Sequence, residues 1–374
     1  MIMAMNALSR IVESPDLSLY RLDSTHSPEL EIYCASTPSS RALLNTPETV
    51  GVEFTRRLQE AVEGILGQFP DPEERRRFCP EESGVVHFLR SGLNFGIREA
   101  LYNAWGFNEH LSSFITSQRD RDQYGRWFIR DDAYRKIELP RNATLFIGEI
   151  VATGVTMKNG LQIIGRMAKN LGRPVRNLVF FTVGCHKIEK ALSEFDALMR
   201  ASFRGYHTTY LFYLEGKFHL ADSKTEARLK VQGTDLMRFP ALLAPEFEQS
   251  QFLSETAPLE RCVIYDGGAR AFNPQEHFAE LSAYWEEVVS LGVRGTTLEE
   301  AYRERWPAEE YRLPQAEYLK RKREVWAGVD EKRLLAVYET AGAWLRRLRE
   351  RSGAGSLVEL ARRRLRRISS GRSD

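Results

Sequence analysis

The chain has 374 residues, 43% of them hydrophobic and 28% charged, which is the composition of a soluble globular protein with one large domain or two. No apolar run approaches the length of a membrane span, and the four cysteines show no metal-ligand spacing, so a membrane-spanning protein and a cysteine metal site are both excluded. The net charge of +2 favours no particular partner. We expect reduced thiols and a cytoplasmic protein.

Residues 1 to about 45 mix short strand-like fragments with Ser, Pro and Asp, which predicts an irregular N-terminal arm. Thr46-Pro47-Glu48 then has the residues of a helix start, namely a cap, a proline at the first helical position and an acid in the first turn. Apolar residues recur at helical spacing from Phe54 to Leu66, so a helix is predicted up to Gly67.

A short apolar strand over residues 84–89 leads into Arg90-Ser91-Gly92 and a further helix. A cation and free backbone N–H groups are therefore predicted at the carboxyl end of a strand, where ligands bind in open α/β sheets. The next strand is predicted over residues 111–116. The charged and aromatic segment 118–128, which contains Arg119, is typical either of a mobile hairpin that closes over an anion or of an ordinary surface hairpin.

The segment from Thr144 to Met157 predicts a strand, a tight loop and the start of a helix. The loop Ala152-Thr153-Gly154-Val155-Thr156 offers small residues, two hydroxyls and a helix N-terminus to a phosphate. Glu149 stands at the end of the strand, where its carboxylate can accept hydrogen bonds from two sugar hydroxyls. A ribose 5-phosphate would fit this pattern, although Thr-Gly pairs also occur in ordinary turns.

A helix up to residue 171 and an apolar strand over residues 178–183 complete a β-α-β unit, which predicts a parallel sheet. The segment 206–220 predicts a hairpin with its turn at Glu215-Gly216, and residues 221–260 lack a clear pattern. A last apolar strand enters Tyr265-Asp266-Gly267-Gly268, where a turn without bulky side chains can meet the polar edge of a base.

These segments resemble the type I phosphoribosyltransferases, which bind phosphoribosyl pyrophosphate, and among them the uracil phosphoribosyltransferases. The family signature is four apolar residues, two acids and Ala-Thr-Gly-x-Thr, and residues 145–156 match it except that Gly148 holds the first acidic position. Residues 88–93 resemble the family's pyrophosphate loop, and segment 119–140 its flexible loop. Residues 266–272 resemble its uracil loop, with Ala269 in place of the second acid.

The resemblance implies an α/β fold with a doubly wound parallel sheet and a β-hairpin flexible loop. It also implies transfer of ribose 5-phosphate to a uracil-like or other small planar nitrogen base, with release of pyrophosphate. By the same resemblance, residues 152–156 bind the 5-phosphate and Glu149 binds the ribose hydroxyls. The pyrophosphate is bound by Arg90, Ser91 and Gly92, and Arg119 closes over it. Residues 265–268 receive the base. Mg²⁺ would be held mainly by substrate phosphates, without protein ligands.

The resemblance covers residues 46–275, with an insertion at about 200–260, between the arm at 1–45 and a helical extension at 276–374. The basic end of the extension, residues 345–368, could contact RNA, DNA, an anionic membrane surface or an acidic partner, or could be a solvated helix with a frayed tail. The alternative to an enzyme is a non-catalytic phosphoribosyltransferase fold that senses a nucleotide and binds a partner through this end. A homodimer is compatible with either hypothesis.

Overall fold

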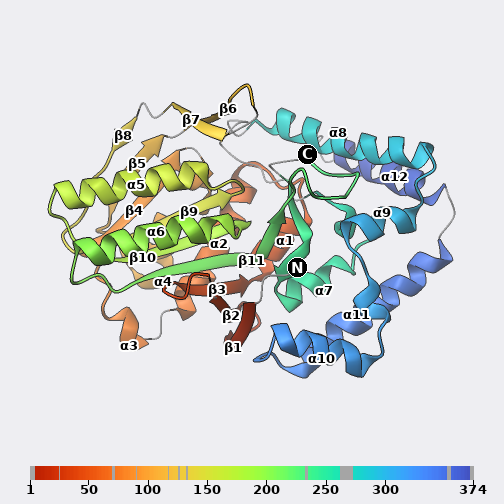
Figure 1. The fold of residues 1–374 in the computed structure, drawn as a ribbon, viewed down its shortest axis with the longest axis horizontal. Helices are drawn as coiled ribbons and strands as arrows, with labels where there is room; N and C mark the ends of the chain where they lie inside the picture. Colours follow the sequence, from red (N-terminus) through yellow and green to blue (C-terminus); the bar gives the residue numbers. More distant parts are fainter. Residues whose placement is uncertain are drawn as a thin grey trace.

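A mixed α/β architecture is seen in the computed structural model, which describes residues 5–24, 26–69, 72–89, 91–116, 118–124, 127–131, 134–231, 235–261, 273–351 and 355–370 (Figure 1). Ten described strands form one sheet in the order β1-β2-β3-β11-β10-β9-β4-β5-β8, with β12 paired to β11. The strands are β1 (Met5–Glu13), β2 (Ser18–Ser24), β3 (Glu31–Ser36), β4 (Ser83–Leu89), β5 (Leu111–Thr116), β8 (Arg135–Lys136), β9 (Ala143–Val151), β10 (Val175–Cys185), β11 (Thr208–Leu220) and β12 (Leu236–Leu243).

The centre of the sheet is parallel, as the β-α-β pattern predicts. Strands β3, β11, β10, β9, β4 and β5 run in one direction, while β2 and β8 run in the opposite direction beside β3 and β5. At the edge, β1 pairs antiparallel with β2. Strands β9 and β10 are buried along almost their whole length because helices cover both faces of the sheet. The chain winds outward from β4 to β5 and then the other way from β9 through β10 to β11. The winding therefore reverses between β4 and β9.

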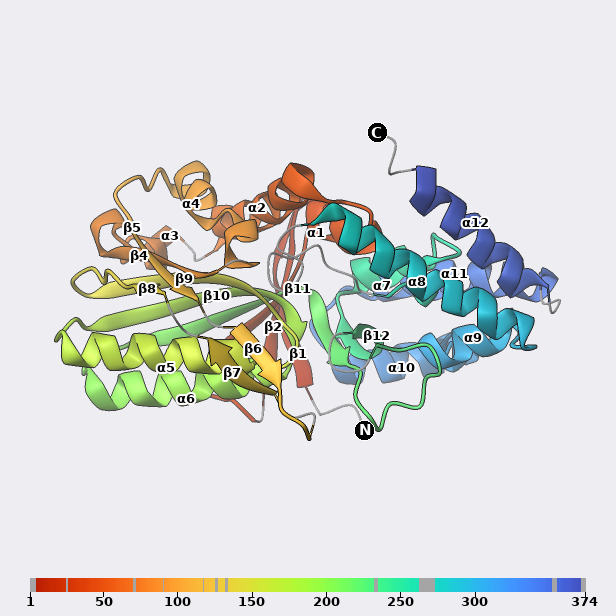
Figure 2. The same ribbon diagram turned by 90° about the horizontal axis from the view of Figure 1, so that it is seen from above.

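Helices lie on both faces of the sheet (Figure 2). One face is covered by α1 (Pro38–Asn45), α2 (Gly51–Gln68) and α4 (Ile97–Trp105), and the other by α5 (Val155–Asn170) and α6 (Lys187–Ser202). The apolar residues of α2 that recur at helical spacing are all buried, among them Phe54, Leu58 and Ile65. Short connecting elements are α3 (Pro72–Arg75), η1 (Pro80–Glu82), η2 (Ser91–Phe95) and η3 (Ala257–Leu259).

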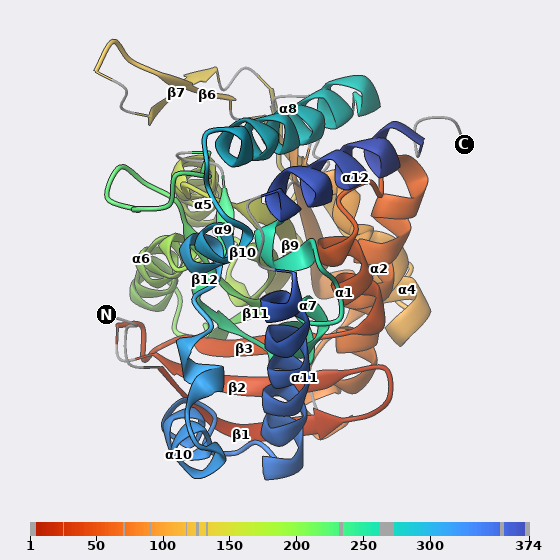
Figure 3. The same ribbon diagram turned by 90° about the vertical axis from the view of Figure 1, so that its right-hand side faces the viewer.

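A hairpin of β6 (Gln118–Arg121) and β7 (Trp127–Asp131) follows the carboxyl end of β5, where the sequence predicts one. Both strands contact α5, and the hairpin lies at the top of the molecule in Figure 3. A hairpin at this place is confirmed.

The N-terminal residues are not an irregular arm. They form β1, β2 and β3, which extend the main sheet, because Leu19, Tyr20 and Leu22 are buried and each strand finds a neighbour to pair with. The predicted helix start at residues 46–48 is also wrong. Helix α1 ends at Asn45, its Ccap Thr46 begins a turn, and α2 starts only at Gly51.

The predicted hairpin at residues 206–220 is a single strand, β11. Glu215 has a φ of 64° and Gly216 a φ of 154°, and together they form an irregularity without reversing the chain. The part before them pairs in parallel with β3 and β10, and the part after them pairs antiparallel with β12. Glu215-Gly216, which has the composition of a turn, therefore forms a bulge, because both halves of the strand pair with neighbours in the sheet.

A helical lobe stands at the carboxyl end of β11 (Figure 1). It contains α7 (Pro245–Gln251), α8 (Pro274–Val293), α9 (Leu298–Arg305), η4 (Glu309–Arg312), α10 (Gln315–Val325), α11 (Glu331–Glu350) and α12 (Ser356–Ser370). The side chain of Asn273 caps α8, and Thr297 forms a capping box with Glu300 at the start of α9. Within the described residues, no helix is both long and apolar enough to cross a membrane.

The basic helix α12 is docked on α8, and its last residues are not frayed in the described range. Its apolar side buries Leu357, Leu360 and Ile368. Arg364 is only 4% exposed, and its guanidinium forms ion pairs with Glu260 at 2.9 Å and with Glu48. The helix is therefore an integral part of the fold.

Candidate functional site

The candidate site lies where the winding of the sheet reverses. Strands β4 and β9 are parallel neighbours, with Val86 opposite Ile147, so the segments that follow them leave the sheet at the same edge. Those segments are η2, which contains Ser91 and Gly92, and the loop 152–154 before α5. The hairpin that contains Arg119 follows β5, the strand next to β4, at this edge. Three of the four predicted loops therefore share one rim of the sheet.

The loop at residues 152–156 leads directly from β9 into α5. Gly154 is the Ncap residue with a φ of 73°, which only glycine adopts easily, and no side chain caps α5 or places an acid in its first turn. All five residues of the loop are half-buried. The N-terminal N–H groups of α5 thus have the orientation and partial positive charge that stabilise a bound anion.

The end of β10 and the start of α6 pack against this loop. The thiol of Cys185, at the end of β10, donates to the carbonyl of Ala152 at 3.0 Å. Burial raises the pKa of Cys185, so the thiol keeps the proton that this hydrogen bond requires. Lys187 packs its backbone against Gly154, because a Cβ added to Gly154 would lie 3.4 Å from the Lys187 carbonyl oxygen. The Lys187 residue itself is exposed, which adds a cation beside the loop.

The second loop packs directly on β9. A Cβ added to Gly92 would lie 3.2 Å from the carbonyl oxygen of Gly148, so the absence of a side chain permits this close approach. His87, near the end of β4, forms a hydrogen bond with the backbone of Gly92 and stacks on Phe114 at 5.1 Å between ring centroids. Burial, with a smaller contribution from Arg98, lowers the pKa of His87 to about 4. The imidazole is therefore neutral near pH 7 and acts as a fixed support for the loop.

The side chain of Phe95 packs against the backbone of Gly148. A Cβ on Gly148 would lie 2.3 Å from Cγ of Phe95, which is fully buried at the end of η2. The ring of the second loop thus occupies the space that a side chain at position 148 would need. Gly148 and Phe95 thus form an interlock between β9 and η2, and no side chain can be accommodated at position 148 while Phe95 keeps its position.

Glu149 points to the opposite face from Gly148, because successive side chains alternate along a strand. It therefore lies on the side of α5 and α6, beside Thr182 of β10, its partner in the strand register. The carboxylate is only 5% exposed, and its Oε1 accepts the Ile150 N–H at 3.0 Å. It stands at the base of the site, on the side of the loop 152–156.

Several predicted site residues lie outside what the structure describes. Arg90 and the turn Tyr265-Asp266-Gly267-Gly268 fall outside the described residues, together with the rest of segment 262–272. For Ser91, in η2, and Arg119, in β6, the structure describes the backbone. The base-binding role of residues 265–268 stays a prediction.

The sequence reasoning missed the residues that hold the loops. His87 interrupts an otherwise apolar strand just before the Ser-Gly turn, and this interruption was a usable signal. Phe95 and Cys185 gave no signal beyond their apolar character. Their contacts depend on distant residues that the fold brings together.

The site presents mainly hydrogen-bond donors, which are the groups that bind an anion. Backbone N–H groups, hydroxyls and an exposed lysine surround one buried carboxylate, a set that suits phosphate groups better than a bare cation. Among the residues that the structure describes, no group of three or more His, Cys, Asp or Glu side chains could hold a metal ion.

Comparison of the sequence with family models and with curated proteins gives no match in either case. The resemblance to the phosphoribosyltransferases rests on the motifs alone.

Proposed function

We propose that the protein transfers the ribose 5-phosphate group of phosphoribosyl pyrophosphate to a small planar nitrogen base, uracil-like or related, and releases pyrophosphate. The observation that carries the proposal is the meeting of two predicted phosphate loops at one reversal point of a parallel sheet, with Gly92 packed on Gly148. Ligands of open α/β sheets bind at such a point, outside the carboxyl ends of the strands.

Each part of the substrate would contact a different element. The N–H groups and hydroxyls of residues 153–156 would bind the 5-phosphate, and Glu149 would accept hydrogen bonds from the ribose. Ser91 and Gly92, with Arg90, would bind the pyrophosphate, and Arg119 on the hairpin would close over it. The turn at residues 265–268 would receive the base.

The chemistry follows from charge. Departure of pyrophosphate leaves positive charge on the ribose ring and adds negative charge to the leaving group, so fixed donors at the leaving oxygens lower the barrier. The neutral His87 would hold the Gly92 backbone where those donors are needed. Mg²⁺, when bound, neutralises part of the pyrophosphate charge, and it would enter with the substrate. The exclusion of water by the closing hairpin would favour the base over hydrolysis.

The test is pyrophosphate release by the full chain with phosphoribosyl pyrophosphate, Mg²⁺ and a panel of bases. Thr156→Val removes one phosphate donor with little change of shape and should raise KM about tenfold or more. Thr340→Val, in α11, is the matched control and should leave KM unchanged. Absence of pyrophosphate release with every base would refute the proposed transfer, and absence of substrate binding as well would refute the site itself.

A second candidate is a nucleotide sensor without transferase activity. Phe95 favours it, because the ring fills the place of one of the two acids that bind ribose in the family. Calorimetry separates the two hypotheses: tight binding of phosphoribosyl pyrophosphate or a nucleoside monophosphate without pyrophosphate release supports the sensor. The position of α12 in the structure identifies no binding partner for this helix under either hypothesis.

A further inference from the structure

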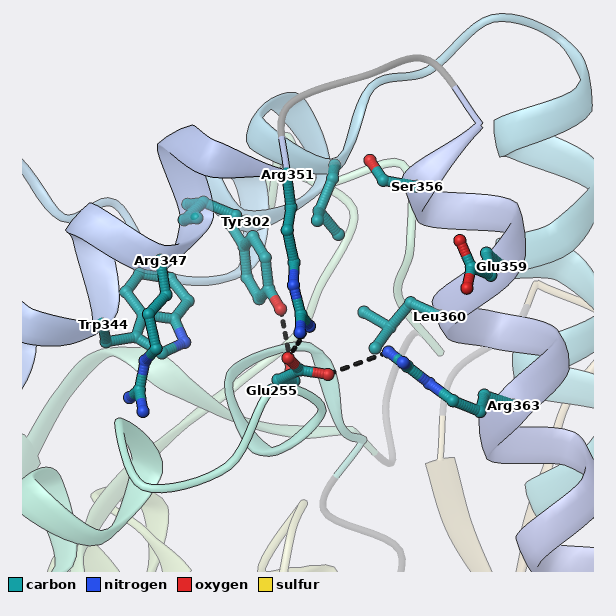
Figure 4. A pocket seen from close by; sticks show the side chains of 11 residues that line it. Glu255, Tyr302, Trp344, Arg347, Arg351, Ser356, Glu359, Leu360 and Arg363 are labelled. Atoms are coloured by element: carbon teal, nitrogen blue, oxygen red, sulfur yellow. Dashed lines mark hydrogen bonds and ion pairs between the residues drawn. The ribbon is translucent and has the colours of Figure 1, made fainter.

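A pocket of about 300 Å³ lies in the helical lobe, between α9, α11 and α12 (Figure 4). Its floor is apolar and aromatic, formed by buried side chains from all three helices. These are Leu298, Tyr302, Trp344, Leu348 and Leu360. The rings of Tyr302 and Trp344 meet edge to face at 4.7 Å between centroids, so they form a rigid wall. The volume is at the lower end of the range for small-molecule sites, about 300–1,000 Å³.

The rim carries three guanidinium groups and two carboxylates. Arg351 and Arg363 both bind the carboxylate of Glu255, the latter at 2.8 Å, and Arg347 donates to a backbone carbonyl nearby. Glu359 also lines the pocket. Figure 4 shows Arg351 and Arg363 reaching toward Glu255 from opposite sides. Three positive and two negative charges leave the rim with a net charge of +1.

The contacts of Glu255 are those that an external carboxylate or phosphate would make. Arginine forks bind both groups with paired, charge-assisted hydrogen bonds. The side chains of Arg351, Arg363 and Glu255 remain 55%, 44% and 45% exposed, and ion pairs so exposed to water contribute little to stability. The Tyr302 hydroxyl donates to the backbone carbonyl of Glu255. The carboxylate can therefore leave the arginines by side-chain rotation while its backbone stays in place.

We propose that this pocket binds a small organic anion, with a ring-sized apolar body on the aromatic floor and one carboxylate or phosphate group between Arg351 and Arg363. The ligand group replaces Glu255, which occupies the arginines when no ligand is bound. The site is independent of the transferase proposal, because its residues belong to the helical lobe.

The test is calorimetric titration of the full chain with phenyl phosphate and benzoate, which distinguish the two anionic groups, and with benzamide as the uncharged control. We expect binding of at least one anion and none of benzamide. Glu255→Gln removes the internal competitor and should tighten binding about three- to tenfold, while Arg363→Gln should weaken it about tenfold or more. Arg366→Gln is the matched control, since Arg366 is exposed on the same helix and does not line the pocket.

Circular dichroism and thermal melting would establish that each variant is folded, and Arg351→Gln provides a second removal if Arg363→Gln is not. The proposal is overturned if neither the wild type nor Glu255→Gln binds any of the anions. It is equally overturned if benzamide binds as well as benzoate, or if Arg366→Gln weakens binding as much as Arg363→Gln, because the attraction would then come from the general charge of α12.

Discussion

The contact between Phe95 and Gly148 can be tested by a double-mutant cycle. In Gly148→Ala the new Cβ would stand 2.3 Å from Cγ of Phe95, whereas carbon atoms in contact prefer about 3.5–4.0 Å. The ring would have to move by about 1 Å inside a closely packed core, and overpacking of this kind costs about 1–3 kcal/mol of unfolding free energy. Phe95→Ala alone should cost about 3–5 kcal/mol.

The double variant should be less destabilised than the sum of the two single variants, by about 0.5–3 kcal/mol, because the new methyl group enters the space that the ring has left. Urea unfolding followed by circular dichroism gives all four free energies. Gly67→Ala is the control, since nothing lies within 4 Å of a Cβ at that exposed helical position, and it should be neutral or stabilising. Strict additivity, or a cost of Gly148→Ala below about 0.5 kcal/mol, would refute the interlock.

Three further predictions concern buried ionisable groups. Burial raises the pKa of Glu215 to about 7, so the folded state binds this proton more tightly than the unfolded state does, and the unfolding free energy should fall as the pH rises from about 4.5 to 7. Glu215→Gln should reduce that fall in pH-dependent urea unfolding, and an unchanged slope would contradict the assignment. Arg364→Met should lower stability by about 3–5 kcal/mol in the same assay, because it leaves Glu260 buried without its countercharge, and adding Glu260→Gln should recover part of the loss. Finally, iodoacetamide should alkylate the half-buried Cys79 before the buried Cys185, and mass spectrometry of samples taken over time would show the order. The reverse order would show that the site around Cys185 opens readily.

The sequence predicted the parallel centre of the sheet and the loop before α5 because both depend on local signals. Residues 145–147 of β9 are an apolar run, and the small and hydroxylated residues after the strand mark a tight turn into a helix. The caps at Asn273 and Thr297 are local in the same sense, since each depends on residues within one helical turn.

The failures involve partners far away in the chain. Glu215-Gly216 has the composition of a turn, but pairing with β12 kept the strand continuous through it. From the sequence, Gly148 is only a departure from the motif that the segment resembles. Its contact with Phe95, more than fifty positions earlier in the chain, is visible only in the fold. The docking of α12 likewise depends on Glu48 and Glu260, which no local pattern connects to a basic helix.

The ion pairs of Arg364 have a consequence for biosynthesis. Glu48 and Glu260 are made long before Arg364, which is 316 positions beyond Glu48 in the chain. While the nascent chain lengthens, the carboxylate of Glu260 has no countercharge from α12, so we expect the region around it to remain loosely packed until that helix leaves the ribosome. Chains that terminate early would present this unfinished surface to chaperones and proteases, which would remove them in preference to the complete protein.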